Sequence, residues 1–173
     1  LAGRRTGPTG QVVIYDINYA MIQAGRHKID PFPALSHIDY VQGDAERITF
    51  PDNTFDCAMV GFGIRNVTHL KQGFGEMIRT LRPGGRFLCL EFSRPTNPLF
   101  RGLYDFYSFT VMPVLGQLLA GSAESYACLP ETIRMFPLPD ELAAMLANLG
   151  LHDVKWKSMT NGISVAHVGT KNG

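Results

Sequence analysis

Polar side chains follow three runs of the chain that have the composition of β-strands. Asp16 ends the run "QVVIYD", Asp44 ends the run "HIDYVQGD", and Arg65 and Asn66 come shortly after the run "FDCAMVGF". In open α/β sheets, ligands bind at the carboxyl ends of the strands. The residues of interest for a ligand site are therefore Asp16, Gly43 to Glu46, Gly61 to Asn66, and Glu91 to Arg94, the last group at the end of the run "RFLCLEF".

The two acids each have a binding interpretation and a structural alternative. The carboxylate of Asp16 can accept hydrogen bonds from both hydroxyls of a ribose, or it can form an Asx turn that leads into a helix. Asp44 stands beside Ala45, and an acceptor next to a small side chain suits the edge of an adenine. The alternative for Asp44 is an acid in another turn.

Alternating strands and helices must hold these residues in place. Apolar residues at helical spacing predict the helices. The first has Asn18 as its N-cap and Met21, Ile22 and Ile29 on one face. The run "FDCAMVGF" is typical of a strand covered on both faces, and "NG" near the C-terminus predicts an antiparallel hairpin. The alternation predicts an α/β fold with a mostly parallel sheet. The expected strands are 11–16, 37–44, 55–62, 86–92, 152–160 and 163–171, and the expected helices are 18–28, 69–81 and 139–150, with broken helices over 98–121.

The composition fits one globular domain over residues 1–173. The chain is 45% hydrophobic and 18% charged, and its net charge of +1 argues against nucleic acid as a partner. No apolar stretch reaches the ~18 residues that a membrane-spanning helix needs. The scattered cysteines Cys57, Cys89 and Cys128 are interpreted as small core side chains in a reducing compartment. The five histidines lie apart from one another, so no metal site is expected.

Several longer stretches resemble one protein family. They are "YDIN", "GDAE", "FPDNTFDCAMVGFGIRNVTH", "LRPGGRFLCLEFS", "YDFYSFTVMPVLG" and "SYACLPETIRMFP". From about Gly10 to Lys171, the chain is similar to the UbiE family of ubiquinone/menaquinone biosynthesis C-methyltransferases. The resemblance implies the Rossmann-like α/β fold of class I methyltransferases, with S-adenosylmethionine as the cofactor.

The resemblance also implies a cofactor site, residue by residue. Asp16 matches the acid that holds the ribose hydroxyls, and Asp44 with Ala45 matches the pair that meets the adenine. Gly61 stands where relatives often have serine, so its contact would come from the backbone. The implied cofactor-binding residues are Asp16, Ile17, Asp44, Ala45, Gly61 and Phe62.

The family's reaction implies roles for a second set of residues. A methyl group is transferred to a ring carbon of a polyprenylated benzoquinol, and ionisation of the neighbouring ring hydroxyl activates that carbon. Arg65 would stabilise the phenolate or hold a water that takes the proton, unless its charge is used in an ion pair with Glu91 or Glu131. Asn66 would orient Arg65 or the hydroxyl. The implied catalytic residues are Arg65, Asn66, Tyr126 and Asp105, the last two as groups that accept or relay the proton.

One motif of the family is absent from the chain. The family's first strand and its glycine loop, "D-x-A-x-G-T-G-D", have no counterpart here, although glycine in that loop lets the backbone approach the methionine part of the cofactor. The expectation is an N-terminally truncated domain that lacks the first strand of the sheet. Its first visible strand would have an unpaired edge, which dimerisation or strand exchange could cover. Whether this chain alone is active is left open.

The resemblance further implies partners and a location. The partners are a polyprenylated quinol substrate, the membrane surface in a peripheral contact, and a second copy of the chain or a quinone-biosynthetic complex. The stretches "RRTGPTGQVV" and "GGRFLCLEFS" resemble mitochondrial members, which predicts the matrix side of the mitochondrial inner membrane. A bacterial member would instead be cytoplasmic and peripheral to the membrane.

Three other functions stay open. One is methylation of a naphthoquinol in the menaquinone pathway. Another is a nicotinamide-dependent oxidoreductase, which also has an acid after its second strand. The third is a non-catalytic scaffold subunit of a quinone-biosynthetic complex. Binding of S-adenosylmethionine separates the methyltransferases from the other two classes.

Overall fold

The computed structural model describes residues 2–7, 9–29, 37–95, 102 and 131–173. The chain divides into two compact units, Leu1–Phe50 and Pro51–Gly173, and each contains one sheet. None of the described helices has the length and the apolar character that crossing a bilayer requires. Almost all of the segment 98–121, where broken helices are expected, lies outside the described residues. Asp105, Tyr126 and Cys128 lie outside them as well.

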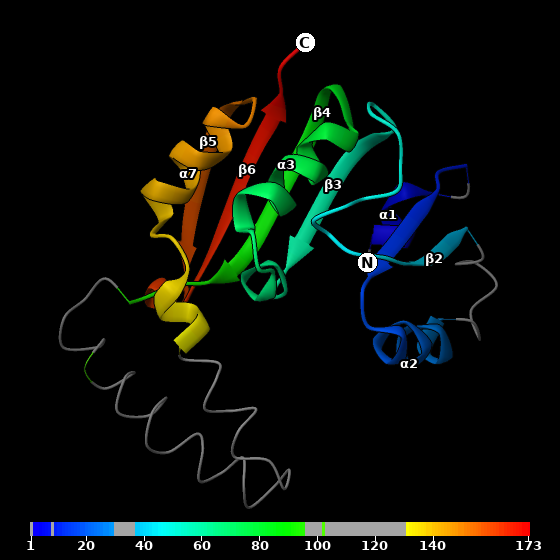
Figure 1. Cartoon of the computed structure of the whole chain (residues 1–173), viewed down its shortest axis with the longest axis horizontal. Helices are drawn as coiled ribbons and strands as arrows, with labels where there is room; N and C mark the ends of the chain where they lie inside the picture. The colour runs from blue at the N-terminus through cyan, green and yellow to red at the C-terminus, as the bar shows by residue number, and fades with distance from the viewer. Residues whose placement is uncertain (1, 8, 30–36, 96–101, 103–130) are drawn as a thin grey trace, which may run out of the picture. The chain divides into compact units, whose positions relative to one another are not determined.

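The first unit has a parallel strand–helix–strand arrangement. Its elements are, in chain order, α1 (Ala2–Thr6), β1 (Val12–Asp16), α2 (Tyr19–Ile29) and β2 (Ile38–Gln42) (Figure 1). Strands β1 and β2 pair in parallel, with Val12 opposite Ile38 and Asp16 opposite Gln42. The helix between two parallel strands is the unit that the sequence predicts here.

Helix α2 begins where the sequence predicts. The side-chain oxygen of Asn18 accepts hydrogen bonds from the backbone N–H groups of Ala20 (2.9 Å) and Met21 (3.3 Å), so Asn18 caps the free donors of the first turn. Ile22 is buried, but Met21 is 62% exposed. The prediction that Met21 and Ile22 share one face is therefore wrong, because consecutive helix residues point about 100° apart. The side chain of Ile29 lies outside the described part of the chain.

The second unit is built on a four-stranded sheet. Its elements are β3 (Phe55–Gly61), the 3-10 turn η2 (Ile64–Asn66), α3 (Leu70–Thr80), β4 (Leu81–Phe92), α7 (Pro139–Asn148), β5 (Leu151–Met159), the 3-10 turn η4 (Thr160–Gly162) and β6 (Ser164–Lys171). The strand order is β3-β4-β6-β5. Strands β3 and β4 are parallel, whereas β6 is antiparallel to both β4 and β5. The predicted hairpin is confirmed, but its connection is longer than "NG" alone, because Met159 pairs with Ser164. Thr160, Asn161 and Gly162 in this connection have positive φ angles of 48°, 58° and 93°.

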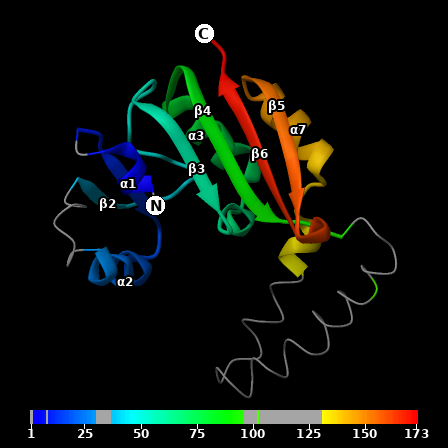
Figure 2. The same cartoon turned by 180° about the vertical axis from the view of Figure 1, so that it is seen from behind.

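The core of the second unit lies between the sheet and two helices. Helices α3 and α7 cover the same face of the sheet, as the two opposite views show (Figures 1 and 2). Phe74 of α3 meets Phe87 of β4 edge to face, with ring centroids 5.8 Å apart. Leu142 and Leu146 of α7 are fully buried. Each such side chain contributes about 1.5–3 kcal/mol through its burial.

The opposite face of this sheet is not covered by any described helix of the second unit (Figure 2). Met59 of β3 is 56% exposed, and Cys57 is exposed as well. Alternate residues of a strand point to opposite faces, and these two point away from α3 and α7. The predictions that β3 is covered on both faces and that Cys57 is a core residue are therefore wrong for the described part of the chain. Cys89 of β4 is buried, as predicted.

Candidate functional site

The carboxyl end of β1 carries the first predicted site residue. Oδ1 of Asp16 accepts a hydrogen bond from the backbone N–H of Asn18 at 2.7 Å, so the Asx turn that was the alternative to a ligand role is present. The second carboxylate oxygen has no hydrogen-bond partner among the described residues and can accept from a ligand hydroxyl. The next residue, Ile17, is 66% exposed, and its carbonyl accepts a hydrogen bond from the side chain of Gln42.

Asp44 and Ala45 lie at the same end of the two-stranded sheet. The backbone N–H of Gly43 donates to the carbonyl of Asp16 at 3.0 Å, which ties the two strand ends together. Asp44 is exposed, and its Oδ1 accepts from a backbone N–H two residues later at 2.8 Å. A Cβ at position 43 would overlap the hydroxyl of Tyr15, so Gly43 permits this close approach. The first unit thus presents two carboxylates from adjacent strand ends.

The carboxyl end of β3 carries a strained residue. Gly61 is the last residue of the strand, and Phe62 follows it with a φ of 56°. The N–H of Phe62 donates to the carbonyl of Leu90 at 2.9 Å, and its ring lies 4.5 Å from that of Phe92. A bulky residue in the left-handed region costs of the order of 1–3 kcal/mol, and such strain concentrates at functional sites. The strain therefore supports this strand end as part of the site.

Arg65 forms a buried ion pair with Glu91. Nη1 of Arg65 lies 2.7 Å from Oε1 of Glu91, and the two side chains are only 10% and 2% exposed. The guanidinium also lies 5.3 Å from the centre of the Phe92 ring, within the range of a cation–π contact. The ion pair considered as an alternative role for Arg65 is therefore present. Its partner is Glu91, whereas Glu131 is exposed.

This ion pair leaves donors of Arg65 unused. Nε is buried and has no hydrogen-bond partner, and none is found for Nη2 within the described residues either. An arginine whose guanidinium still has free N–H groups can bind an anionic oxygen as well as its own carboxylate. Asn66 is exposed beside Arg65 at the end of η2. The strand end can therefore act as an anion site as well as a structural contact.

The structure gathers the predicted residues into two groups. The group at the end of the first unit's sheet consists of Asp16, Ile17, Asp44 and Ala45. The group that follows β3 in the second unit consists of Gly61, Phe62, Arg65 and Asn66. The other two predicted catalytic residues, Tyr126 and Asp105, lie outside the described residues, so their roles stay predictions.

Sequence reasoning placed Glu91 and Phe92 at a strand end and named Glu91 as one possible ion-pair partner of Arg65, but it gave neither residue a role in the reaction. Both stand at the end of the run "RFLCLEF", and both contact Arg65 in the structure. A carboxylate inside an apolar strand was the available signal, because a buried charge requires a partner. The identity of that partner depends on the fold.

The described cysteines are not reactive thiolates. Burial raises the pKa of Cys89 to about 12, and the negative charge of Glu91 adds to the shift. Burial also raises the pKa of Cys57, although Arg86 opposes this shift. Both are therefore thiols at neutral pH and poor nucleophiles. In the part of the chain that the structure describes, no group of three or more His, Cys, Asp or Glu residues is placed to hold a metal ion.

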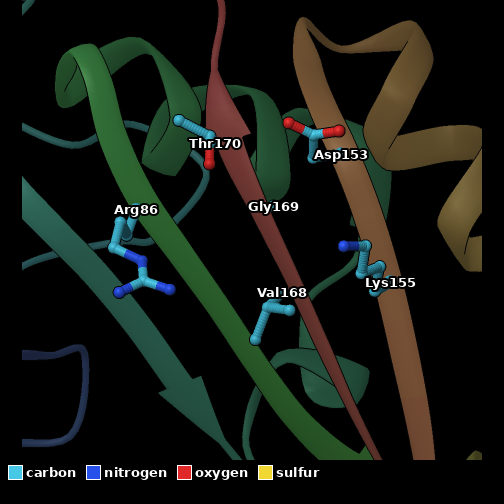
Figure 3. A pocket seen from close by; sticks show the side chains of 6 residues that line it. All are labelled: Arg86, Asp153, Lys155, Val168, Gly169 and Thr170. Carbon is cyan, nitrogen blue, oxygen red and sulfur yellow. The ribbon is translucent and has the colours of Figure 1, made fainter.

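A shallow hollow of about 150 Å³ opens on the uncovered face of the four-stranded sheet (Figure 3). Its lining consists of Arg86 of β4, Asp153 and Lys155 of β5, and Val168, Gly169 and Thr170 of β6. None of the residues predicted to bind the cofactor or to react lines it. The hollow is therefore separate from the candidate site.

Two solved structures with the same fold are methyltransferases. A putative methyltransferase from Bacillus halodurans aligns with 94% of this chain and 84% of its own, with a TM-score of 0.62 and 15% identity. An S-adenosylmethionine-dependent methyltransferase from Thermotoga maritima, described as a possible histamine N-methyltransferase, aligns with 93% of this chain and 73% of its own, with a TM-score of 0.63 and 16% identity. At these identities the likeness shows the fold alone. It is the class I S-adenosylmethionine-dependent methyltransferase fold, as predicted.

Sequence relatives define the family. The model of the ubiE/COQ5 methyltransferase family matches residues 2–171. The ubiquinone/menaquinone biosynthesis C-methyltransferase UbiE of Pseudomonas putida strain W619 is 48% identical over 168 residues, which are 97% of this chain and 66% of the relative. For the Pseudomonas fluorescens SBW25 protein of the same name, the identity is 48% over 165 residues, which are 95% of this chain and 64% of the relative. This chain belongs to the ubiE/COQ5 methyltransferase family, and it spans less than two thirds of the length of these relatives.

Proposed function

We propose that the protein transfers a methyl group from S-adenosylmethionine to a ring carbon of a polyprenylated benzoquinol in ubiquinone biosynthesis. The observation that carries this proposal is the nearly buried Arg65 after β3, whose guanidinium keeps donors without a partner in the described part of the chain. Family membership and the names of the relatives support the same reaction class.

The proposed role of Arg65 is to stabilise the ionised ring hydroxyl. A quinol ring carbon is a weak nucleophile until the neighbouring hydroxyl loses its proton and charge spreads onto the ring. Arg65 can donate to the phenolate oxygen as the charge develops. It does not act as the base, because a guanidinium stays protonated in proteins and has no lone pair free to take a proton. Asn66 orients the hydroxyl or Arg65, and Tyr126 or Asp105 is the candidate that takes the proton.

The proposed cofactor site is the other group of strand-end residues. The free oxygen of Asp16 fits a ribose hydroxyl, and the small side chain of Ala45 beside Asp44 leaves room for an adenine edge. Ile17 completes the set in the first unit, and the roles of Gly61 and Phe62 of the second unit in cofactor binding stay predictions. S-adenosylmethionine, when bound, would supply an electrophilic methyl group.

The substrate, the partners and the cellular location are further proposals that follow from the proposed methyl-transfer reaction. A menaquinone-pathway naphthoquinol is the alternative substrate, because the names of the relatives include both quinones. A peripheral membrane contact and either a homodimer or a quinone-biosynthetic complex are the proposed assemblies. The relatives compared are bacterial and do not support the mitochondrial resemblance, so a cytoplasmic place beside the membrane is the first choice. One methyltransferase domain over 1–173 stays a prediction.

Calorimetric titration of S-adenosylmethionine into the chain tests the proposal. We expect Asp16→Asn to weaken binding by about 10- to 100-fold, as for a lost hydrogen bond to a charged group. Asparagine keeps an acceptor for the Asn18 N–H, so the Asx turn is preserved and the ligand contact is the part that changes. Asp39→Asn is the matched control, because Asp39 is an exposed acid on β2 that bonds to Gln11 instead.

Each outcome of the titration points to one function. Selective loss of affinity in Asp16→Asn supports the methyltransferase. Equal affinities for the wild type and for Asp16→Asn would contradict the ribose contact. A chain that binds a nicotinamide dinucleotide in place of S-adenosylmethionine would be an oxidoreductase, and a chain that binds neither fits the scaffold subunit.

A further inference from the structure

The carboxylate of Glu91 contacts Arg65 at two places, the backbone N–H and the guanidinium. Its Oε1 accepts hydrogen bonds from Nη1 of Arg65 (2.7 Å) and from the backbone N–H of Phe92 (3.0 Å). Its Oε2 accepts a longer bond from the backbone N–H of Arg65 (3.4 Å). One end of the arginine is thus held at its backbone and the other at its guanidinium.

We propose that Glu91 is a positioning residue for the methyl-transfer reaction. It holds the guanidinium of Arg65 so that Nη2, which has no partner among the described residues, can donate to the ionised ring hydroxyl of the substrate. The inference rests on the proposed function and deepens it. It adds Glu91 of β4 as a residue on which the proposed role of Arg65 depends.

Fold stability alone gives a weak reason for this buried pair. Desolvation of an arginine and a carboxylate offsets most of their attraction, and apolar side chains of similar volume often stabilise a core equally well. Here the pair is nearly inaccessible to solvent and still leaves arginine donors without partners among the residues that the structure describes. A positional role accounts for both features.

A fixed arginine also has a kinetic advantage over a mobile one. An arginine that is already held loses less side-chain freedom when it meets a ligand. The ring of Phe92, 5.3 Å from the guanidinium, further limits where the side chain can lie. A guanidinium placed in advance can stabilise charge in the transition state without rearranging.

A second ion pair in the same unit provides a control, and it joins β4 to β3, whereas the Arg65–Glu91 pair joins β4 to the turn η2. Arg82 of β4 lies 2.7 Å from Asp56 of β3, the same distance as in the Arg65–Glu91 pair, but these side chains are 55% and 84% exposed. Exposed pairs of this kind contribute little to stability. Asp56→Asn therefore removes a carboxylate from the same sheet without changing the candidate site.

The first measurement is steady-state methyl transfer to a short-chain benzoquinol by the wild type, Glu91→Gln, Arg65→Met, the double variant and Asp56→Asn. A misplacement of ~1 Å can cost about 100-fold in rate, so we expect Glu91→Gln to lower kcat by about 100-fold. The KM for S-adenosylmethionine should change little, and Asp56→Asn should match the wild type.

Because Glu91 acts through Arg65, the double variant should be no slower than Arg65→Met. An unchanged kcat in Glu91→Gln, or losses that multiply in the double variant, would overturn the inference.

The second measurement does not depend on methyl transfer. The probe is 4-nitrophenol, because only its ionised form absorbs visible light. If Glu91 holds Arg65 in place, Glu91→Gln weakens binding of the ionised probe, as Arg65→Met does. If Glu91 only balances the charge of Arg65, loss of the carboxylate charge strengthens that binding. Stronger or unchanged binding therefore counts against positioning.

Together the two measurements separate the inference from the proposed reaction. A wild type that transfers no methyl group but binds the probe through Arg65 and Glu91 contradicts the reaction and supports the positioning role. A wild type that neither reacts nor binds the probe overturns both. Thermal unfolding checks that each variant folds. If Glu91→Gln does not fold, Glu91→Asp replaces it, because it keeps the charge and moves it by one methylene; unchanged kcat and probe binding in that variant would overturn the inference.

Discussion

At the scale of single residues, His167 of β6 shows how the core controls a titratable group. Its Nε2 lies 2.9 Å from the carbonyl of Pro139, and its Nδ1 is buried without a hydrogen-bond partner in the described part of the chain. Because a carbonyl only accepts, Nε2 carries the proton of the neutral ring. Burial lowers the pKa of His167, although the Pro139 carbonyl and the charge of Asp140 oppose the shift.

We expect the free energy of unfolding to fall as the pH is lowered below about 6.5, the ordinary pKa of histidine. In that range the unfolded chain protonates His167 while the folded chain keeps it neutral down to its lowered pKa. The unfolded state then binds more protons, so this residue removes up to about 1.4 kcal/mol of stability per pH unit. Urea unfolding above and below pH 6.5 measures the effect. His167→Gln should lose most of this dependence, and an unchanged slope in that variant would contradict the assignment.

At the scale of elements, Lys171 of the last strand, β6, donates hydrogen bonds to carbonyls at the C-terminal end of α3. Nζ of Lys171 donates to the carbonyls of Arg79 (2.9 Å) and Leu81 (2.6 Å) and to the side-chain oxygen of Asn53 (2.9 Å). Carbonyls at a helix C-terminus lack partners inside the helix, and a cation is favourable there. Lys171 therefore connects β6 to the end of α3 and to the loop before β3.

Replacement of Lys171 by methionine should destabilise the second unit. Lys171→Met removes all three bonds and leaves carbonyls without their charged donor, so we expect the free energy of unfolding to fall by about 1–3 kcal/mol. Chemical denaturation measures the change. Lys157→Met on the edge strand β5 is the control, because Lys157 is exposed and surface substitutions usually change stability by less than about 0.5 kcal/mol. Equal effects of the two substitutions would show that the contacts of Lys171 contribute nothing.

At the scale of the whole molecule, the two faces of the four-stranded sheet have different environments. One face packs on α3 and α7, and the other exposes Met59, Cys57 and Val168 in the described part of the chain. Strands in parallel sheets are usually covered on both faces. Strand β3 is therefore more apolar than a strand with one covered face needs to be, and one covered face is all that the described part of this unit provides.

Thiol labelling distinguishes the two faces. We expect a maleimide to modify Cys57 in the folded protein and Cys89 only after unfolding, because Cys57 is exposed and Cys89 is buried. Labelling of Cys57 should be slow at neutral pH, since partial desolvation by its neighbours raises the pKa of this thiol although its surface is accessible. Peptide mass spectrometry locates the label and reports Cys128 separately. Protection of Cys57 in the folded protein would mean that its face is covered.

Much of the fold could be predicted from the sequence because its causes are local. Asn18 caps α2 through bonds to residues two and three positions later, and "NG" forms part of the hairpin turn through its own backbone angles. Apolar spacing placed α3 and α7 correctly for the same reason. The strand-end positions of Asp16, Asp44 and Arg65 follow once the strands are known.

The sequence by itself therefore determined the elements, the family resemblance and the list of candidate site residues. Only the tertiary structure decided which distant groups meet. Arg65 contacts Glu91 across 26 positions, and Lys171 reaches the end of α3 across 90 or more. The tertiary structure also decided that the side chains of Cys57 and Met21 are exposed. Partners and burial depend on how remote segments pack, whereas caps, turns and periodicity depend on neighbours along the chain.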